Sequence, residues 1–316
     1  MMARALPLSG RLSGESGLRL LMLLLALALL VIGLLLPLAT MLIKSVQDRS
    51  GDFVGLANFA RYVQTPALVG SIINSVSIAL ISTLTVVSLA FLCAYGITRT
   101  CMPSKRVFRM LSILPLLAPS LLPAISLVYL FGNQGWFKEA LLGGSIYGPI
   151  GIVMGMTFWI FPHALMIMMT ALSNSDARLY EAADALGTPK WRSFLTITLP
   201  GARYGIISCA FVAFTLAITD FGVPKIIGGQ FSVLATDVYR QVVGQQNFQM
   251  GAVVSVILLL PALLSFAVDR WIQRRQVAQL SARAVPWQPT PSPLRDWVFA
   301  LLCYGVAAAI LAVIAT

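Results

Sequence analysis

Seven stretches of about 20 mostly apolar residues divide this chain, and that is the length a helix needs to cross the hydrocarbon core of a bilayer. The composition agrees, because 58% of the residues are hydrophobic and only 10% are charged, unlike a soluble domain. The sequence therefore predicts an all-α membrane protein. Its expected spans are Leu20–Ile43, Ile72–Tyr95, Leu111–Phe131, Ile150–Ala171, Gly205–Ile227, Ala252–Trp271 and Trp297–Thr316.

Positive charges gather on one side of the predicted membrane. The formal net charge is +11, but the basic residues fall in short loops between spans, where they set orientation, so nucleic acid is not a predicted partner. With the N-terminus inside, all but six of the 22 Lys and Arg residues lie in inner segments. The outer six are Lys44, Arg49, Arg61, Lys138, Lys225 and Arg240. This bias predicts a cytoplasmic N-terminus.

The apolar runs also define the domain boundaries. Residues 1–19 form a predicted cytoplasmic segment, and residues 20–275 hold six spans. The basic start resembles a signal peptide, but the apolar run is too long and no A-x-A-like cleavage site follows, so a retained helix is predicted. Residues 276–296 contain Pro286, Pro289, Pro291 and Pro293, which favour an extended linker. Residues 297–316 form the additional span.

The polar segment 174–203 carries strong local helix signals. Four residues at its start can cap a helix: Ser173, Asn174, Ser175 and Asp176. Apolar residues then recur on one helical face: Leu179, Ala182, Ala183 and Leu186. Gly187 suits the left-handed position that ends a helix, and Thr188 and Pro189 suit the cap and first turn of another, bounded by Pro200. The segment is therefore predicted to form two short helices with a sharp bend at Gly187.

The same segment contains Glu181-Ala182-Ala183, then Gly187 after three residues, then Ile197-x-Leu199-Pro200 after nine more. This pattern resembles the EAA loop of ABC import permeases, the membrane subunits that grip a cytoplasmic ATPase. The resemblance implies a six-helix type I ABC importer transmembrane domain, here with a seventh C-terminal transmembrane helix. It also implies that this loop couples to the ATPase, with Glu181 as the polar contact, Ala182 and Ala183 as the close-packing surface, and Gly187 as the pivot. The alternative is an amphipathic loop on the membrane surface, which small Ala side chains disfavour.

The resemblance implies several partners. The chain has no G-x-x-x-x-G-K-[ST] phosphate loop, so ATP would be hydrolysed by a separate cytoplasmic ABC ATPase dimer, and this chain would be a transport subunit without a cofactor. An extracytoplasmic substrate-binding protein and a second permease half, fused, homodimeric or paralogous, would complete an importer in the lipid of the inner membrane. Because some members are fused duplicates, residues 297–316 either open a second half or form an extra anchor.

Three residues within the spans are candidates for the translocation pathway. Asp220 lies deep in the fifth span, where a charge is costly and usually faces a watery interior; the alternative is a carboxylate at the outer interface, bonded to amides near Gly222 or paired with Lys225. Pro119, between Pro115 and Pro123, predicts a bent third span. His163 in the fourth span is the chain's single histidine, and a hydrogen bond to a neighbour is its simpler explanation.

The substrate is predicted from likeness to one branch of the family. Asp220-Phe-Gly-Val-Pro224 and Gln246–Gly251 are similar to permeases for ferric iron and 2-aminoethylphosphonate, and Thr236–Tyr239 and Val242–Gln245 favour the phosphonate members. We therefore expect 2-aminoethylphosphonate, with ferric iron or another small solute as the alternative. Residues 55–62 and 245–252 are candidates for contact with a binding protein.

Other classes of function lack a matching constellation. An intramembrane enzyme needs paired acids, an H-E-x-x-H motif or a Ser with a His partner, and none is recognisable here. The four cysteines are scattered without a CxxC spacing, so they are predicted to be packing residues rather than metal ligands or disulfide partners. An ATPase-independent channel would leave the EAA-like loop without a purpose.

Overall fold

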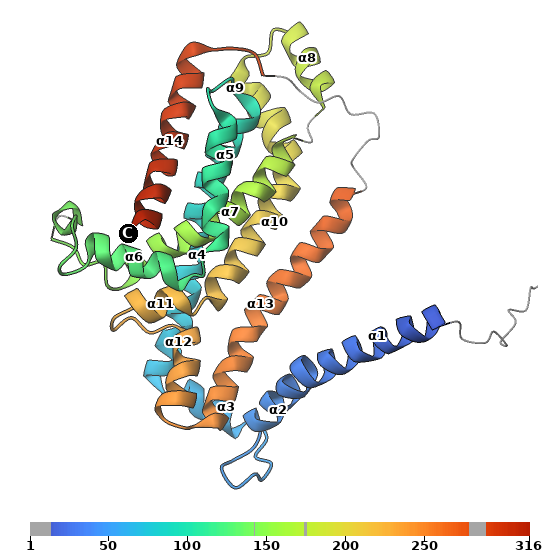
Figure 1. Cartoon of the computed structure of the whole chain (residues 1–316), viewed down its shortest axis with the longest axis vertical. Helices are drawn as coiled ribbons and strands as arrows, with labels where there is room; N and C mark the ends of the chain where they lie inside the picture. Colours follow the sequence, from blue (N-terminus) through green and yellow to red (C-terminus); the bar gives the residue numbers. More distant parts are fainter. Residues whose placement is uncertain (1–13, 142, 174–175, 278–288) are drawn as a thin grey trace, which may run out of the picture.

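The computed structural model describes residues 14–141, 143–173, 176–277 and 289–316 (Figure 1). These residues contain no β-strand; Gln47 and Phe53 form an isolated bridge. The helices are α1 (Gly14–Leu30), α2 (Leu36–Ser45), α3 (Ala57–Val63), α4 (Pro66–Arg99), α5 (Lys105–Ile113), α6 (Leu121–Phe131), α7 (Pro149–Ser173), α8 (Ala177–Ala185), α9 (Lys190–Ser193), α10 (Leu199–Thr219), α11 (Gly222–Ile227), α12 (Leu234–Tyr239), α13 (Phe248–Val277) and α14 (Pro293–Ala315). Short 3₁₀ segments are η2 (Leu114–Leu117) and η3 (Lys138–Leu141), and π turns are η1 (Val31–Leu35), η4 (Phe194–Thr198) and η5 (Arg240–Gly244).

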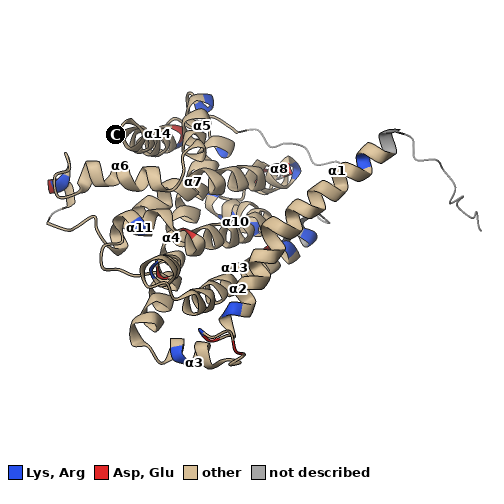
Figure 2. Ribbon diagram, turned by 60° about the horizontal axis from the view of Figure 1, so that its bottom comes forward, with Lys and Arg blue, Asp and Glu red and all other residues tan. Residues whose placement is uncertain are grey.

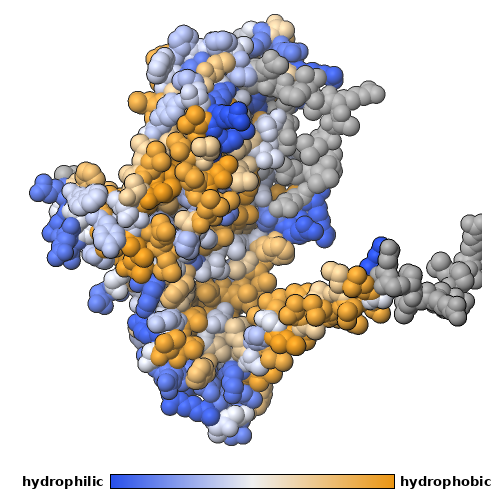
Figure 3. All heavy atoms as spheres, in the orientation of Figure 1, coloured by the Kyte–Doolittle hydropathy of each residue, from blue (hydrophilic) through white to orange (hydrophobic). Residues whose placement is uncertain are grey.

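The predicted spans are present as long apolar helices. Six helices of the described chain are long and apolar enough to cross a membrane, and the bent pair α5–α6 makes a seventh if it counts as one span. Lys and Arg lie mainly at helix ends and in loops (Figure 2), and apolar residues cover the middle of the bundle and the projecting helix α1 (Figure 3). The structure therefore confirms an all-α membrane fold.

Helices α4, α7, α10 and α13 form the body of the bundle (Figure 1). We call the end that carries α8 the α8 end, and the opposite end, with α3 and α12, the α12 end. Helices α7 and α10 cross closely at small residues, because a Cβ added at Gly205 would lie 2.2 Å from the Cβ of Ala171. At Gly151 an added Cβ would lie 2.4 Å from Cγ2 of Ile227. Small residues at such crossings let backbones approach, as is usual inside membranes.

The third span differs most from its prediction. We expected one bent helix over Leu111–Phe131, but α5–η2 and α6 meet at an angle of 106°. Pro115 lies in η2, Pro119 lies in the break itself, and Pro123 lies in the first turn of α6. Because each proline removes a backbone donor and restricts the residue before it, three of them in nine residues divide the helix rather than bend it.

Pro200, which was expected to bound a helix, instead lies within a long span, as Pro37 does. The π turn η1 ends two residues before Pro37, and η4 ends two residues before Pro200. A π turn is wider than an α turn, which leaves room beside the preceding carbonyls for a proline ring that has no N–H to donate. The first span therefore runs from Gly17 to Ser45 and the fifth from Lys190 to Thr219.

Helix α1 projects from the bundle, whereas α14 packs onto it (Figure 1). The most apolar stretch of the first span is 0% buried. On α14, Phe299 and Cys303 lie against Gly96 of α4, where an added Cβ would be 3.2 and 3.3 Å from them. The Tyr304 hydroxyl donates to the carbonyl oxygen of Pro103 at 2.8 Å. We expected this helix to begin at Trp297, but it begins at Pro293; most of the predicted 276–296 linker and of the predicted 1–19 segment lies outside the described residues.

Candidate functional site

The predicted coupling segment forms a helix, a turn and a second helix at the α8 end. Asp176 is the N-cap of α8, because its carboxylate accepts a bond from the Arg178 N–H at 3.1 Å. The other predicted caps include Asn174 and Ser175, which lie outside the described residues. Gly187 has φ +67°, the left-handed conformation predicted for it. The N–H groups of Gly187 and Thr188 donate to the carbonyls of Asp184 and Ala183, which satisfies the end of α8.

The second helix of this segment differs from its prediction in two ways. Pro189 rather than Thr188 is the N-cap of α9, a shift of one residue. The helix also does not end at Pro200, because α9, η4 and α10 form the continuous span Lys190–Thr219. The widened turn η4 accommodates Pro200, as described above. Ile197, Leu199 and Pro200 therefore belong to the start of a membrane-spanning helix, not to the end of a short loop helix.

Helix α8 leaves a small apolar face uncovered. Leu179 is 57% exposed and Leu186 is 83% exposed, and Glu181 and Ala182 are also exposed. Ala183 was predicted to belong to the same face, but it is buried against the bundle. A nine-residue helix that turns one side to the bundle and large apolar side chains away from it is suited to contact another protein.

Two of the three predicted pathway residues come together toward the α12 end. Asp220 ends α10, and its carboxylate accepts bonds from the Val223 N–H at 2.9 Å and from the side chain of Ser120. Ser120 follows Pro119 in the break between α5 and α6. Gly222 packs so closely there that an added Cβ would lie 2.3 Å from the Ser120 Oγ. The structure thus places two interrupted helices side by side, with Asp220 only 8% exposed between them.

The bonds of Asp220 agree with the second interpretation given above, a carboxylate held by backbone amides near Gly222. A carboxylate bonded to amides near Gly222 was one expectation, and the bond from Val223 to Asp220 matches it. A pair with Lys225 was the other, but the Lys225 Nζ lies over the Tyr239 ring, 4.2 Å from its centroid. Asp220 therefore accepts a bond from an amide of the first turn of α11 as well as lying beside the break in the third span.

His163 lies apart from this convergence. Gly155 of α7 is the residue that packs against Val223, and His163 follows it by two helical turns, or about 12 Å toward the α8 end. The His163 ring lies 5.7 Å from the Trp159 ring. These positions favour packing within α7 over a shared site with Asp220.

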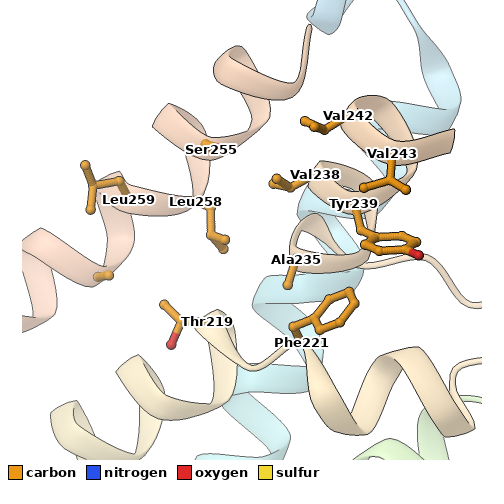
Figure 4. A pocket seen from close by; sticks show the side chains of 11 residues that line it. Thr219, Phe221, Ala235, Val238, Tyr239, Val242, Val243, Ser255, Leu258 and Leu259 are labelled. Carbon is orange, nitrogen blue, oxygen red and sulfur yellow. The ribbon is translucent and has the colours of Figure 1, made fainter. Parts of the chain in front are cut away.

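A cavity of about 500 Å³ opens between α10, α12 and α13 (Figure 4). Its walls are largely apolar, with Phe221, Val238 and Leu258 among them, and Thr219 and Ser255 supply hydroxyl groups. The side chains of Phe221 and Ala235 point toward the space from one side and Leu258 from the other. Such a surface accepts apolar groups rather than a small hydrated ion.

A second cavity, of about 310 Å³, is lined by two basic residues. Lys225 stacks on Tyr239, and the Arg240 guanidinium donates to Ser232 Oγ at 2.7 Å and pairs with Asp237. The remaining lining comes mainly from the turn 229–232. No carboxylate lines this cavity among the described residues, so its chemistry favours an anion.

The two segments proposed to meet a binding protein lie together at the α12 end. The Gln249 Nε2 donates to the carbonyl oxygen of Asp48 at 3.1 Å, and Tyr62 packs with Met250 and Val253. Burial, with the negative charge of Asp237, raises the pKa of Tyr62 to about 12. A cavity of about 330 Å³ separates the segments and is lined by Arg49, Asn58, Arg61 and Asn247 among others. Residues 55–62 and 245–252 thus form one platform.

Sequence reasoning missed two buried charged residues. Arg99 was counted as a loop charge that sets orientation, yet it is 3% exposed. Asp269 was not among the predicted pathway residues; it is 9% exposed in α13 and accepts a bond from Ser208 of α10. Both residues lie close to the end of a predicted span. A charged residue there is either solvated or paired with another group, and this position was the signal that a buried pair was possible.

Residues 87–277, more than half of the chain, match the model of a protein family described as "Binding-protein-dependent transport system inner membrane component". The chain is 25% identical over 244 residues to the sulfate transport system permease protein CysT of Escherichia coli, a match that covers 75% of this chain and 86% of that protein. It is 26% identical over 234 residues to the ferric transport system permease protein FbpB of Actinobacillus pleuropneumoniae, covering 70% of this chain and 34% of that protein.

A solved structure of a bacterial alginate ABC transporter, in complex with an alginate pentasaccharide-bound periplasmic protein, has the same fold. Its similar chain superposes with a TM-score of 0.66 at 16% identity, covering 85% of this chain and 97% of that one. The related proteins are transport permeases, and this chain is a transport subunit rather than an enzyme. Together these matches show that the chain belongs to the family of binding-protein-dependent transport system inner membrane components, the permeases of type I ABC importers.

Proposed function

We propose that this chain docks through α8 onto a cytoplasmic ABC ATPase dimer and lines the pathway of an importer for 2-aminoethylphosphonate. The observation that carries the docking is the uncovered apolar face of α8, with Leu186 83% exposed. Glu181 and Ala182 lie on exposed positions of the same helix, as a contact surface requires. Gly187 gives the turn its left-handed pivot. Ile197, Leu199 and Pro200 connect the docked segment directly to α10.

The charge distribution supports an orientation with the α8 end in the cytoplasm. The basic residues counted as inner lie at or near this end where the structure describes them, for example Arg99, Arg178, Lys190 and Arg192. Excess Lys and Arg mark the cytoplasmic side of a membrane protein. In this orientation the N-terminus is cytoplasmic and the platform of residues 55–62 and 245–252 faces an extracytoplasmic binding protein.

A second permease half, fused, homodimeric or paralogous, completes the pathway in this proposal. Helix α1 supports it, since large apolar side chains are exposed all along it, among them Leu23, Leu29 and Ile32. Lipid covers such a surface as well as a protein does, so the argument for a second half rests also on the apolar cavity between α10, α12 and α13.

The basic cavity with Lys225 and Arg240 supports an anionic substrate. A phosphonate or another oxyanion is attracted by the positive side chains of Lys225 and Arg240, of which Arg240 is already paired with Asp237, whereas a bare ferric ion is repelled by them. Sulfate is the second candidate, because the similar permease of Escherichia coli is named for sulfate transport and sulfate has the same sign of charge. Ferric iron is the third, from the similar permease of Actinobacillus pleuropneumoniae.

Whole-cell uptake tests this proposal. A strain that lacks the chain but keeps its ATPase and binding protein is complemented with it, and labelled 2-aminoethylphosphonate, sulfate and ferric iron are offered separately. We expect restored uptake of 2-aminoethylphosphonate alone. Restored sulfate or iron uptake would reassign the substrate, and uptake of none, with the protein in the membrane, would contradict the proposal that this chain suffices for its half of the pathway.

A further inference from the structure

One buried cation joins the ends of two spans at the α8 end. Arg99 is the last residue of α4, and its Nη2 donates to the carbonyl oxygen of Leu172 at 2.8 Å. Leu172 lies in the last turn of α7, where carbonyls have no partner within the helix. The positive charge also lies at the negative end of the α7 dipole. Arg99 therefore ties the end of α7 to the end of α4.

Tyr180 of α8 contacts the same cation and a third span. The Arg99 Cζ lies 4.8 Å from the centroid of the Tyr180 ring, within the range of a cation–π interaction. The Tyr180 hydroxyl lies 2.9 Å from the Thr198 Oγ1, and Thr198 ends the π turn that leads into α10. One side chain of α8 is thus bound to α4 through its ring and to α10 through its hydroxyl.

The surroundings of this joint are packed by aromatic rings. Phe194 of η4 meets Phe91 and Tyr95 of α4 edge to face, at 6.1 and 5.9 Å between centroids. These contacts hold the start of the fifth span against α4. The exposed Leu179 and Leu186 lie about 100–120° around α8 from Tyr180. Helix α8 therefore presents an apolar flank outward while Tyr180 anchors it to the bundle.

We propose that Arg99 and Tyr180 are positioning residues that make α4, α7 and α10 follow a displacement of α8. The proposal rests on the proposed function, in which α8 docks on the ATPase. If the joint is loosened, the ATPase stays bound and hydrolyses ATP, but α8 shifts without carrying the three spans. Less substrate is then imported for each ATP consumed.

The hydroxyl link is tested with Tyr180→Phe, Thr198→Val and the double variant. The complete transporter, purified through a tag on this chain and reconstituted with its binding protein, is assayed for substrate uptake and ATP hydrolysis in the same vesicles. We expect each single variant to lower uptake per ATP about fivefold, the worth of one hydrogen bond, and the double variant to lower it no further. Unchanged uptake per ATP, or a double variant about 25-fold lower, as additivity would give, would overturn the proposal.

Tyr204→Phe is a matched control. Arg203 lies 4.7 Å from the Tyr204 ring centroid and donates to its hydroxyl, so it forms a similar but exposed pair near the same end. We expect no change in uptake per ATP there. An equal loss in Tyr204→Phe would show that phenol hydroxyls at this end matter in general, and would contradict a specific joint.

Arg99→Lys examines the cation with the positive charge retained. Lysine has no planar fork to lie over Tyr180 while it bonds Leu172, so we expect uptake per ATP to fall by about tenfold, with ATPase recovery unchanged. Unchanged uptake per ATP in this variant would contradict the role of Arg99. If the unaltered chain recovers no ATPase, the proposed function itself is wrong; if it recovers ATPase and all variants stay coupled, the joint alone is wrong.

Discussion

The two ends of this bundle are built in opposite ways. At the α8 end a short helix is tied to the ends of α4 and α10 by Tyr180 and Arg99, and its free side is apolar and exposed. Toward the α12 end, two spans are interrupted near Pro119 and Asp220. A cavity of about 500 Å³ lies between α10, α12 and α13, and one of about 310 Å³ lies beside α11 and α12. A tied end transmits a displacement, whereas an interrupted end rearranges at little cost in packing. This contrast agrees with the proposed roles of the two ends, ATPase docking at the α8 end and the substrate pathway toward the α12 end.

Breaking the turn at the α8 end is expected to have the largest effect. Glu181→Lys with Gly187→Pro reverses a contact charge and places a proline, which requires φ near −65°, where Gly187 has φ +67°. We expect loss of ATPase association with membrane insertion intact, measured by co-purification. The control is Gly51→Pro, the same change at another glycine of positive φ, at the α12 end. If the α8 variant recovers as much ATPase as the unaltered chain, the proposed docking through α8 is wrong.

A single charge on the docking face sharpens the same comparison. Leu186→Asp places a carboxylate where an apolar contact is proposed, and we expect about tenfold weaker ATPase binding, the usual cost at a central contact residue. Leu294→Asp is matched to it, because Leu294 of α14 is 81% exposed and Leu186 is 83% exposed. The binding constants are measured by titrating purified ATPase onto the chain in nanodiscs. Equal losses in both variants would show that the α8 face has no special role.

At the interrupted end, two variants of Asp220 distinguish the role of its negative charge from the role of its hydrogen bond to α11. Asp220→Asn keeps an oxygen that can accept the Val223 N–H bond but removes the negative charge, so we expect the protein to stay folded with uptake reduced about threefold. Asp220→Ala also removes the acceptor of the Val223 N–H bond, at a cost of about 1 kcal/mol, and should lower thermal stability as well. Thermal unfolding in detergent and uptake in cells are compared. Full uptake in Asp220→Asn would mean that Asp220 acts only as a hydrogen-bond acceptor for α11 and that its charge has no role in transport.

The smallest effect is expected at the basic cavity. Lys225→Gln removes one of two positive charges there, and since exposed charges act mainly on encounter rates, we expect the KM for an anionic substrate to rise about threefold with kcat unchanged. The dependence of KM on salt should weaken in parallel. Lys138→Gln, in η3 away from this cavity, is the control. A change in kcat alone would place Lys225 in the gating movement instead of in substrate capture.

Apolar length and turn chemistry made most of the fold predictable. The runs of apolar residues gave the spans, and Asp176 and Gly187 gave the ends of α8, because each signal is local. The 106° break was not predicted, since proline spacing alone does not distinguish a bent helix from a divided one. The difference depends on whether neighbouring helices fill the kink, which is a tertiary property.

The exposed residues of the candidate site could be predicted from the sequence, whereas its buried charged residues could not. Glu181 and Ala182 follow a motif and are exposed as a contact requires. Arg99 escaped notice because its partner Leu172 is 73 positions away, so its place near a span end did not decide whether it was solvated or buried. Asp269 and Ser208 escaped for the same reason, 61 positions apart. Pairings of this kind arise only when helices are packed together.

The turn η4 also has a consequence for reading mutagenesis data. A π turn adds one residue to a helix of 3.6 residues per turn, which rotates everything after it by about 100° relative to a regular helix. Along Lys190–Thr219, residues before and after Phe194–Thr198 therefore follow two different phases. A tryptophan or cysteine scan analysed with one uninterrupted period would misplace Lys190–Ser193 by about 100° relative to Leu199–Thr219, and a phase jump near residue 196 is the signature to look for.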